Sequence, residues 1–396
     1  MNCKRTLALG AAAATAVAVP ALAATSAGAS TPNSTVYVSS HGTASARDAG
    51  CSSAAYKSIG AAVAAVARGG KVVVCGGTYH EDVAVTKTLS LLGQSHAVID
   101  AASRINGILV TAAHVTVSGF KVTNAIGEGI LVRSANNVTI AGNVVTHNDL
   151  GGVPVNPVKT SYPECQSQGG IPGDCGEGIH LMGSSYSTVA HNVSTGNSGG
   201  ILVSDETGPA AHNHITGNVV ANNLFDCGVT VVGHNRQAAP GGVPHPKVAG
   251  VYANDIAGNN ISGNGTKGNG AGVVLATGLP GGAVYDNTVQ GNSINGNGMS
   301  GVTVHSHVPG EFLNGNVITH NLIGTNNLKG DRDFTHVDTQ TTGVLVATVS
   351  PLSIKVSGNV IAKDHFGIWT TGPVTVTSHN GHDNSFRGVA VPVAQG

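Results

Sequence analysis

A short phrase of glycine followed by alternating aliphatic residues returns along most of this 396-residue chain. It reads Gly-Ile-Leu-Val or a close variant, and it begins at Gly107, Gly129, Gly178, Gly200, Gly228, Gly250, Gly272, Gly301, Gly343 and Gly367. Several of the gaps are 22 residues, and the longer gaps indicate one repeat plus an insertion. A fixed period with short strand signals predicts a stacked repeat, because no single unit can bury its own apolar face.

Strict alternation of apolar and polar residues excludes helices from most of the chain. Parallel strands normally need a long crossover, but a coiling chain brings each strand beside its equivalent one coil later, about 4.8 Å away. The sequence therefore predicts an all-β fold, a single parallel β-helix of about ten coils that spans residues 33–396.

A second phrase, typified by the Gly-Asn-Val-Val-Thr-His-Asn segment at 142–148, places asparagine at the turns, since glycine tolerates positive φ there. Stacked turns align equivalent side chains, so we expect amide ladders and no chemistry from this phrase. One ladder is predicted from Asn143, Asn192, Asn218, Asn259, Asn292, Asn316 and Asn359. A second is predicted from Asn148, Asn197, Asn223, Asn264, Asn297 and Asn321.

The amino-terminal segment differs from the repeats. Residues 1–23 have the basic start, apolar stretch and small-residue end of a secretory signal peptide, and residues 24–32 follow as a flexible leader. We therefore expect a secreted, extracellular protein, and no later run is long and apolar enough to span a membrane. An Ala-rich helix over 56–68, followed by a strand over 71–75, is predicted to cap the open end of the core.

The charge and cysteine content limit the possible binding partners and predict the disulfides. Only 10% of the residues are charged and the net charge is -1, which excludes an electrostatic field for nucleic acid or for anionic lipid. In an oxidising compartment we expect disulfides between Cys51 and Cys75 and between Cys165 and Cys175, with Cys227 free and buried.

The whole pattern resembles the right-handed parallel β-helix proteins of the pectin lyase-like group over residues 33–390. The amino-terminal piece resembles the opening of many exported bacterial members, with Tyr-Val-Ser at 37–39, Gly-Thr-Tyr at 77–79 and then Glu81. The resemblance implies a right-handed solenoid and an extended carbohydrate lying along its stacked strands. It specifies activity weakly, because this scaffold hosts lyases, hydrolases, esterases, epimerases and non-catalytic adhesins.

The candidate active site lies where polar residues interrupt the outward rows at neighbouring coils. Glu128 and Glu177 each precede a repeat glycine, and His180 is the outward residue of the second repeat. Two glutamates one strand apart match the roughly 5 to 5.5 Å carboxyl spacing of retaining glycosidases, and their mutual repulsion is expected to raise one pKa. Alternatively, both glutamates accept hydrogen bonds from exposed loop amides beside their glycines.

Further residues are candidates for binding. Arg133 is expected to clamp a sugar carboxylate, and Asp205 with Glu206 leaves the next strand as substrate contacts. The predicted substrate-binding set is Arg133, Asp205, Glu206, His305 and Trp369. Trp369 either stacks on a sugar ring or closes the carboxyl-terminal end of the core.

A second polar cluster lies around 305–338. Asp331 and Asp333 have the spacing of Ca²⁺ ligands on one loop, and Arg332 or His336 is the place to look for a base if the fold runs a lyase reaction. The alternative is a hydrogen-bonded turn without a metal. The histidines are scattered and are expected to sit at turns in place of asparagine.

These features predict a secreted polysaccharide-degrading enzyme, with glycoside hydrolysis placed ahead of lyase chemistry. The expected partner is a polysaccharide, with no nucleic acid and no membrane after export. A non-catalytic exported protein that binds glycans or cell surfaces is the alternative, and it requires an open, flat face with exposed aromatics. A metal-handling assembly factor is least supported, since the chain has only three methionines.

Overall fold

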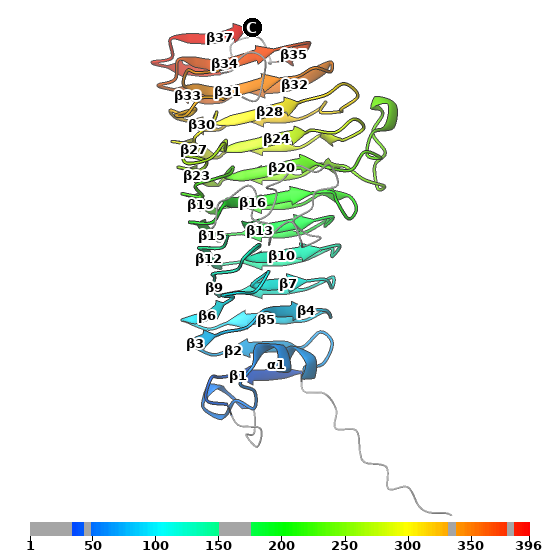
Figure 1. The fold of residues 1–396 in the computed structure, drawn as a ribbon, viewed down its shortest axis with the longest axis vertical. Coiled ribbons are helices and arrows are strands. Elements are labelled where there is room, and N and C mark those ends of the chain that lie inside the picture. The colour runs from blue at the N-terminus through cyan, green and yellow to red at the C-terminus, as the bar shows by residue number, and fades with distance from the viewer. Residues whose placement is uncertain (1–33, 43–48, 150–175, 332–337, 378–383) are drawn as a thin grey trace, which may run out of the picture. The chain divides into compact units, whose positions relative to one another are not determined.

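The computed structural model describes residues 34–42, 49–149, 176–331, 338–377 and 384–396. They form a right-handed parallel β-helix in which three long sheets run along the stack of coils. Figure 1 shows the strands of one sheet, from β4 to β37, lying one above another. The predicted signal peptide and leader, Cys165, Cys175, Arg332, Asp333 and His336 lie outside the described residues.

Each coil from β2 onward contributes one strand to each of the three sheets, and β1 adds a further strand to sheet A. Sheet A has 12 strands, which are β1(Thr35–Val38), β2(Lys71–Val74), β5(Ser90–Gly93), β8(Thr116–Ser118), β11(Thr139–Ala141), β14(Thr188–Ala190), β18(His214–Thr216), β22(Asp255–Ala257), β26(Thr288–Gln290), β29(Val317–Thr319), β32(Leu352–Ser357) and β35(Val374–Thr377). Sheet B has 11 strands, which are β3(Gly77–Tyr79), β6(Ala97–Asp100), β9(Lys121–Thr123), β12(Val144–Thr146), β15(Val193–Thr195), β19(Val219–Ala221), β23(Asn260–Ser262), β27(Ser293–Asn295), β30(Leu322–Ile323), β33(Val360–Ala362) and β36(Ser385–Arg387). Sheet C also has 11 strands, which are β4(Val83–Val85), β7(Ile108–Val110), β10(Ile130–Arg133), β13(Glu177–Met182), β16(Gly199–Ser204), β20(Val229–Gly233), β24(Val273–Thr277), β28(Val302–Ser306), β31(Thr342–Ala347), β34(Phe366–Thr371) and β37(Val391–Gln395).

Successive strands of sheet C are parallel and in register at the repeat phrase. Ile130 pairs with Ile179, and Ile179 pairs with Ile201. These residues point inward and belong to one continuous core of valine, isoleucine and leucine. The prediction that equivalent positions in successive coils are vertical neighbours is therefore confirmed.

Glycine is required at the start of the repeat phrase for a steric reason that the alternation pattern did not reveal. A Cβ at Gly129 would lie 2.3 Å from Cγ1 of Val145 and 2.6 Å from the backbone oxygen of Gly178. Gly200 and Gly228 face the same obstruction, a core side chain of sheet B together with the next glycine's carbonyl. The corner where the chain enters sheet C thus has no room for a side chain.

The two predicted amide ladders exist, although two of their asparagines were assigned to the wrong ladder. The first runs through Asn143, Asn192, Asn218, Asn259, Asn292, Asn321, Asn359 and Asn384, each amide donating to the next side-chain oxygen. The second runs through Asn148, Asn197, Asn223, Asn264, Asn297 and Asn326. It ends at Asp364, where burial raises the pKa of the carboxyl to about 7.

The assignment of Asn316 to the first ladder and of Asn321 to the second was wrong. Asn316 ends a third ladder at another corner, which runs through Asn213, Asn254 and Asn287. The cause is that the same Gly-Asn turn precedes strands of both sheet A and sheet B, so local sequence does not distinguish the two corners. His147, His191 and His320 occupy the positive-φ position before ladder asparagines, which confirms that these histidines sit at turns.

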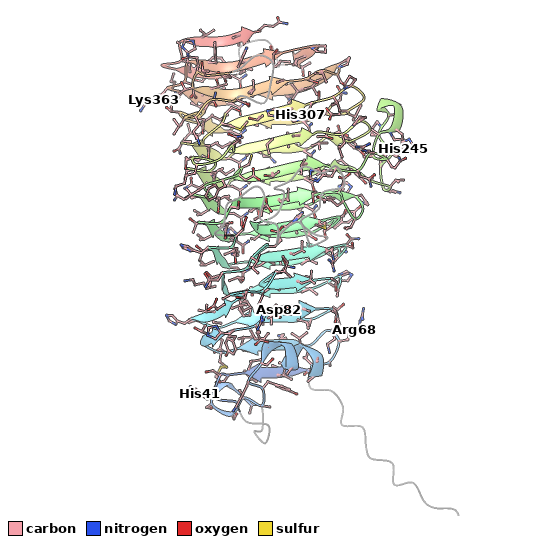
Figure 2. All side chains as sticks on the ribbon, in the orientation of Figure 1. His41, Arg68, Asp82, His245, His307 and Lys363 are labelled. Carbon is pink, nitrogen blue, oxygen red and sulfur yellow. A yellow bond between two sulfur atoms is a disulfide. The ribbon has the colours of Figure 1, made fainter. Side chains whose placement is uncertain are left out.

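One repeat assignment was also wrong. The phrase at Gly250 leads into β21(Val251–Tyr252), which belongs to a small three-stranded sheet with β17(Ala210–Ala211) and β25(Val284–Tyr285). Sheet C passes directly from β20 to β24. The intervening loop carries the short 3-10 helix η4(Pro240–Gly242), and His245 marks this loop in Figure 2. The buried strand β21 therefore has the sequence pattern and the spacing of a sheet C strand, although it lies at a different corner of the coil.

The amino-terminal cap is shorter than predicted. Helix α1(Ile59–Ala65) packs on the first strands of the stack, and Ile59, Ala62 and Val63 are buried in the core. Its first N–H groups donate to the carboxylate of Glu81, at 2.7 Å from Ile59 and 3.0 Å from Gly60. Residues 56–58 stay outside the helix because Tyr56 pairs with Val38 as a bridge.

The cysteine predictions hold where the structure tests them. A disulfide joins Cys75 to Cys51 in the 3-10 helix η1(Cys51–Ser53), and Cys227 is free and buried. Across the part of the chain that the structure describes, no helix combines the length and the apolar character needed to cross a membrane.

A ladder asparagine should be far more important to stability than its exposed neighbour. Asn259 donates to Ile215 O and Asn292 Oδ1 and accepts from the backbone and side chain of Asn218. Asn259→Ala leaves these buried groups unpaired, so we expect a loss of roughly 2–4 kcal/mol in denaturant unfolding. The control Asn260→Ala, at an exposed position, should change stability by less than about 0.5 kcal/mol, and equal effects of both variants would contradict the ladder's role.

Candidate functional site

Three polar side chains that the sequence singled out meet on the outer side of sheet C. Oxygen and nitrogen atoms of Glu128, Glu177 and His180 lie within 4.8 Å of one another. Nδ1 of His180 is 3.2 Å from Oε1 of Glu128. The three side chains are 0%, 1% and 0% exposed, so all three lie away from solvent, and the alternative that the glutamates accept hydrogen bonds from loop amides stays a prediction.

The register of sheet C produces this meeting. The Gly129 amide donates to Glu177 O, which places the two glutamates at equivalent positions in successive coils. Glu177 in turn pairs with Gly199 of β16, and a Cβ at Gly199 would approach Oε1 of Glu177 to 3.1 Å. Gly199 therefore leaves room for the Glu177 side chain, a contribution that sequence reasoning missed.

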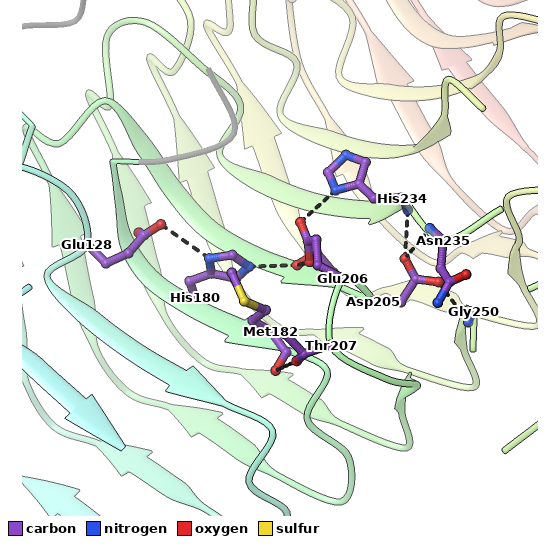
Figure 3. A network of polar contacts seen from close by, with 10 residues as sticks. Glu128, His180, Met182, Asp205, Glu206, Thr207, His234, Asn235 and Gly250 are labelled. Carbon is purple, nitrogen blue, oxygen red and sulfur yellow. Dashed lines mark hydrogen bonds and ion pairs between the residues drawn. The ribbon is translucent and has the colours of Figure 1, made fainter. Parts of the chain in front are cut away.

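A chain of hydrogen bonds extends from this group to the next coils (Figure 3). Nε2 of His180 is 2.6 Å from Oγ of Ser204, and that hydroxyl donates to Oε2 of Glu206. Oε1 of Glu206 is 2.6 Å from Nδ1 of His234. The chain thus runs from Glu128 through His180, Ser204 and Glu206 to His234, almost entirely away from solvent.

Asp205 holds the loop that follows β20. Its Oδ1 accepts the backbone N–H groups of His234 at 2.6 Å and Asn235 at 3.1 Å, and its Oδ2 accepts that of Gly250 at 2.8 Å. These three bonds give Asp205 a structural role, and its predicted contact with substrate stays a prediction.

The two adjacent acids have opposite electrostatic environments. Burial is the largest influence on Asp205 and raises its pKa to about 6, although the N–H groups of His234 and Gly250 oppose it. Burial alone would also raise the pKa of Glu206, but the hydrogen bond and charge attraction from His234 outweigh it, so that pKa falls to about 2. Glu206 is therefore a stable anion inside the chain of hydrogen bonds.

The remaining predicted site residues lie apart from the group. His305 on β28 is four strands from β13, roughly 19 Å at one strand spacing each, and Trp369 is six strands away, roughly 29 Å. Nε2 of His305 is 3.5 Å from Oδ2 of the buried Asp331. Trp369 stacks on Phe366 and packs on Leu345 outside the core.

The predicted roles of Arg133 as a clamp for a sugar carboxylate and of Asp331 as a Ca²⁺ ligand stay predictions. Arg133 ends β10 in register with Met182, two coils before Ser204 in the same outward column. The backbone groups of Asp331 and Asp338 bond to each other in both directions, at 2.8 and 3.0 Å, which makes them the base of a loop. This contact favours the hydrogen-bonded turn there, and Asp333 falls outside the described residues.

Sequence reasoning missed Ser204 and His234 as members of the site. The repeat spacing already placed Ser204 beside Met182 in the next coil, as the register of β13 and β16 shows, so the sequence contained the information needed to find Ser204. His234 joins through the loop after β20, whose course depends on the buried carboxylate of Asp205. Nothing in the spacing of the repeats predicts that course.

Comparison with known proteins supports the fold. Residues 106–279 match the family model described as a right handed beta helix region, whereas no curated protein matches the sequence. An alginate lyase from Paenibacillus sp. str. FPU-7 superimposes with a TM-score of 0.52 at 13% identity, covering 85% of this chain and 95% of the lyase. Pectate lyase Pel9A gives 0.52 at 19% identity, covering 88% of this chain and 79% of that one.

A third similar structure is the A-module of Azotobacter vinelandii mannuronan C-5 epimerase AlgE4, with a TM-score of 0.50 at 18% identity over 82% of this chain and 88% of the module. Identities this low establish the fold and carry no activity across. They confirm the resemblance to the pectin lyase-like right-handed β-helix.

The Glu206 environment makes a testable contribution to stability. Because the pKa of Glu206 is lowered in the folded protein, its stabilising effect is present above pH about 4.5 and is lost as the pH falls toward 2. Glu206→Gln should therefore cost on the order of 2 kcal/mol at pH 7 and almost nothing near pH 2, as measured by denaturant unfolding against wild type at each pH. The exposed carboxylate variant Asp82→Asn should show no such trend, and parallel pH profiles for Glu206→Gln and wild type would refute the effect.

Proposed function

We propose that this chain is a secreted polysaccharide-degrading enzyme, with glycoside hydrolysis ahead of lyase chemistry. The observation that carries the proposal is the convergence of Glu128, Glu177 and His180, whose polar atoms lie within 4.8 Å of one another. The similar structures that act on alginate, pectate and mannuronan support the polysaccharide class as an analogy of fold.

The paired carboxylates suit a retaining glycosidase. In that mechanism, carboxyl groups about 5 to 5.5 Å apart divide the work, one as acid and then base, the other as nucleophile. We assign the acid and base role to Glu128, because its contact with His180 offers a route for exchanging a proton. Glu177 is then the nucleophile, and its side chain packs in the space that Gly199 leaves open.

The burial of the site sets a condition on catalysis. Each of the three side chains is at most 1% exposed, so a sugar reaches them only after the residues that cover them have moved. Once covered again, the carboxylates would act in a site that excludes water, where electrostatic effects are stronger.

The binding-only alternative receives less support. It requires a flat face with several exposed aromatics. Among the described residues, Tyr186 is the one large aromatic side chain that is exposed. The metal-handling alternative requires histidines and methionines clustered in space, but Met182 and Met299 are both buried and lie on different coils.

The proposal is tested by incubating the purified protein with uronic and neutral polysaccharides. New reducing ends without ultraviolet absorbance indicate hydrolysis, unsaturated ends indicate lyase chemistry, and no product from any substrate contradicts an enzyme. Glu177→Gln should lower the activity about 100-fold or more while retaining the fold, because it removes a reacting carboxylate. Asp82→Asn removes an exposed carboxylate and should remain fully active; a fully active Glu177→Gln would eliminate the site.

A further inference from the structure

The hydrogen bonds around His180 fix which ring nitrogen carries the proton. A carboxylate only accepts hydrogen bonds, so the hydroxyl of Ser204 uses its hydrogen toward Glu206. The Ser204 oxygen must then accept from Nε2 of His180, 2.6 Å away. The proton of a neutral His180 therefore lies on Nε2, and Nδ1 presents a lone pair.

That lone pair faces a negatively charged group. Nδ1 of His180 lies 3.2 Å from Oε1 of Glu128, so two acceptors face each other unless a proton or a cation lies between them. The other oxygen of Glu128 is buried and has no hydrogen-bond partner among the residues that the structure describes. The second carboxylate of the group, that of Glu177, is within 4.8 Å of both partners.

We propose that His180 Nδ1 and the carboxylates of Glu128 and Glu177 bind a divalent transition-metal cation, of the zinc or manganese class. A proton between Nδ1 and Oε1 would leave the other buried oxygen of Glu128 without a partner among the described residues, whereas a divalent cation can be bound by both oxygens of that carboxylate. Buried polar and charged groups without a partner are strongly unfavourable. One imidazole with two carboxylates suits Zn²⁺ or Mn²⁺, whereas Ca²⁺ takes oxygen ligands only.

The surrounding geometry agrees with a metal site. Ligand atoms of one cation lie within about 4.4 Å of each other at bond lengths of about 2.2 Å, so small side-chain rotations bring the 4.8 Å group to this size. Metal-binding histidines usually donate their other ring N–H to an oriented acceptor, and the chain through Ser204, Glu206 and His234 supplies one.

This inference goes beyond the proposed function and uses the same carboxylates. A cation would occupy them in place of a sugar, so the metal-loaded protein is a resting form of the site. The site also differs from the Ca²⁺ position predicted at Asp331 and Asp333, which offers oxygen ligands on another part of the stack.

The test measures metal directly and needs no substrate. Protein produced with added Zn²⁺ or Mn²⁺ and purified without chelator should carry one equivalent by mass spectrometry. Removing the metal with a chelator in mild denaturant and returning it should lower and then restore the melting temperature by several degrees. Glu128→Gln and His180→Ala should lose the equivalent, whereas the control Asp331→Asn should retain it.

Ser204→Ala keeps all three ligands and removes only the hydrogen bond that orients His180, so it should weaken metal binding about 10- to 100-fold. This variant tests the site even if a variant of a ligand residue fails to fold. Metal-free protein from both media overturns the proposal, as does binding of Ca²⁺ alone. Unchanged binding in Glu128→Gln and His180→Ala, or loss in Asp331→Asn, also overturns it. Because polysaccharide cleavage is measured separately, the proposed metal binding and the proposed enzymatic activity can each be contradicted without the other.

Discussion

Parallel backbone pairing between one coil and the next is the constraint on which the rest of this structure depends. It places equivalent residues about one strand spacing apart, so every position in the coil becomes a column along the stack. Inward columns supply a continuous aliphatic core, and the corner columns supply asparagine ladders that satisfy buried backbone groups. Corner glycines are required because a Cβ there would collide with both the core and the next coil.

The same register creates the candidate site at the expense of electrostatic stability. Placing Glu128 over Glu177 brings two carboxylates together in a buried position, which a fold selected for stability alone would avoid. Hydrogen bonds through Ser204 and Glu206 hold the imidazole of His180 in place, but a neutral His180 offers the carboxylate of Glu128 no donor. The proposed cation, shared by the group, would compensate the buried carboxylate of Glu128.

Much of this was accessible from the sequence, because a strict period turns linear spacing into spatial adjacency. Periodicity predicted the parallel β-helix, and the resemblance to the pectin lyase-like group implied its right-handed coil. The Cys51–Cys75 disulfide followed from proximity, and polar interruptions of the outward rows located Glu128, Glu177 and His180. The errors arose where different corners share the same local chemistry, as with Asn316, Asn321 and the phrase at Gly250. His234 escaped prediction because its position depends on a long loop held by Asp205, a contact between residues that no period relates.

The stacking of Glu128 on Glu177 is tested most directly by a cross-link. In a Cys227→Ala background, Glu128→Cys and Glu177→Cys together should oxidise to a disulfide, since neighbouring parallel positions have Cα atoms about 4.8 Å apart and disulfides span about 4.4 to 6.8 Å. Mass spectrometry of the folded protein after proteolysis should find the two peptides joined. A folded double variant whose two thiols stay free under the same oxidation would contradict the register and the site built on it.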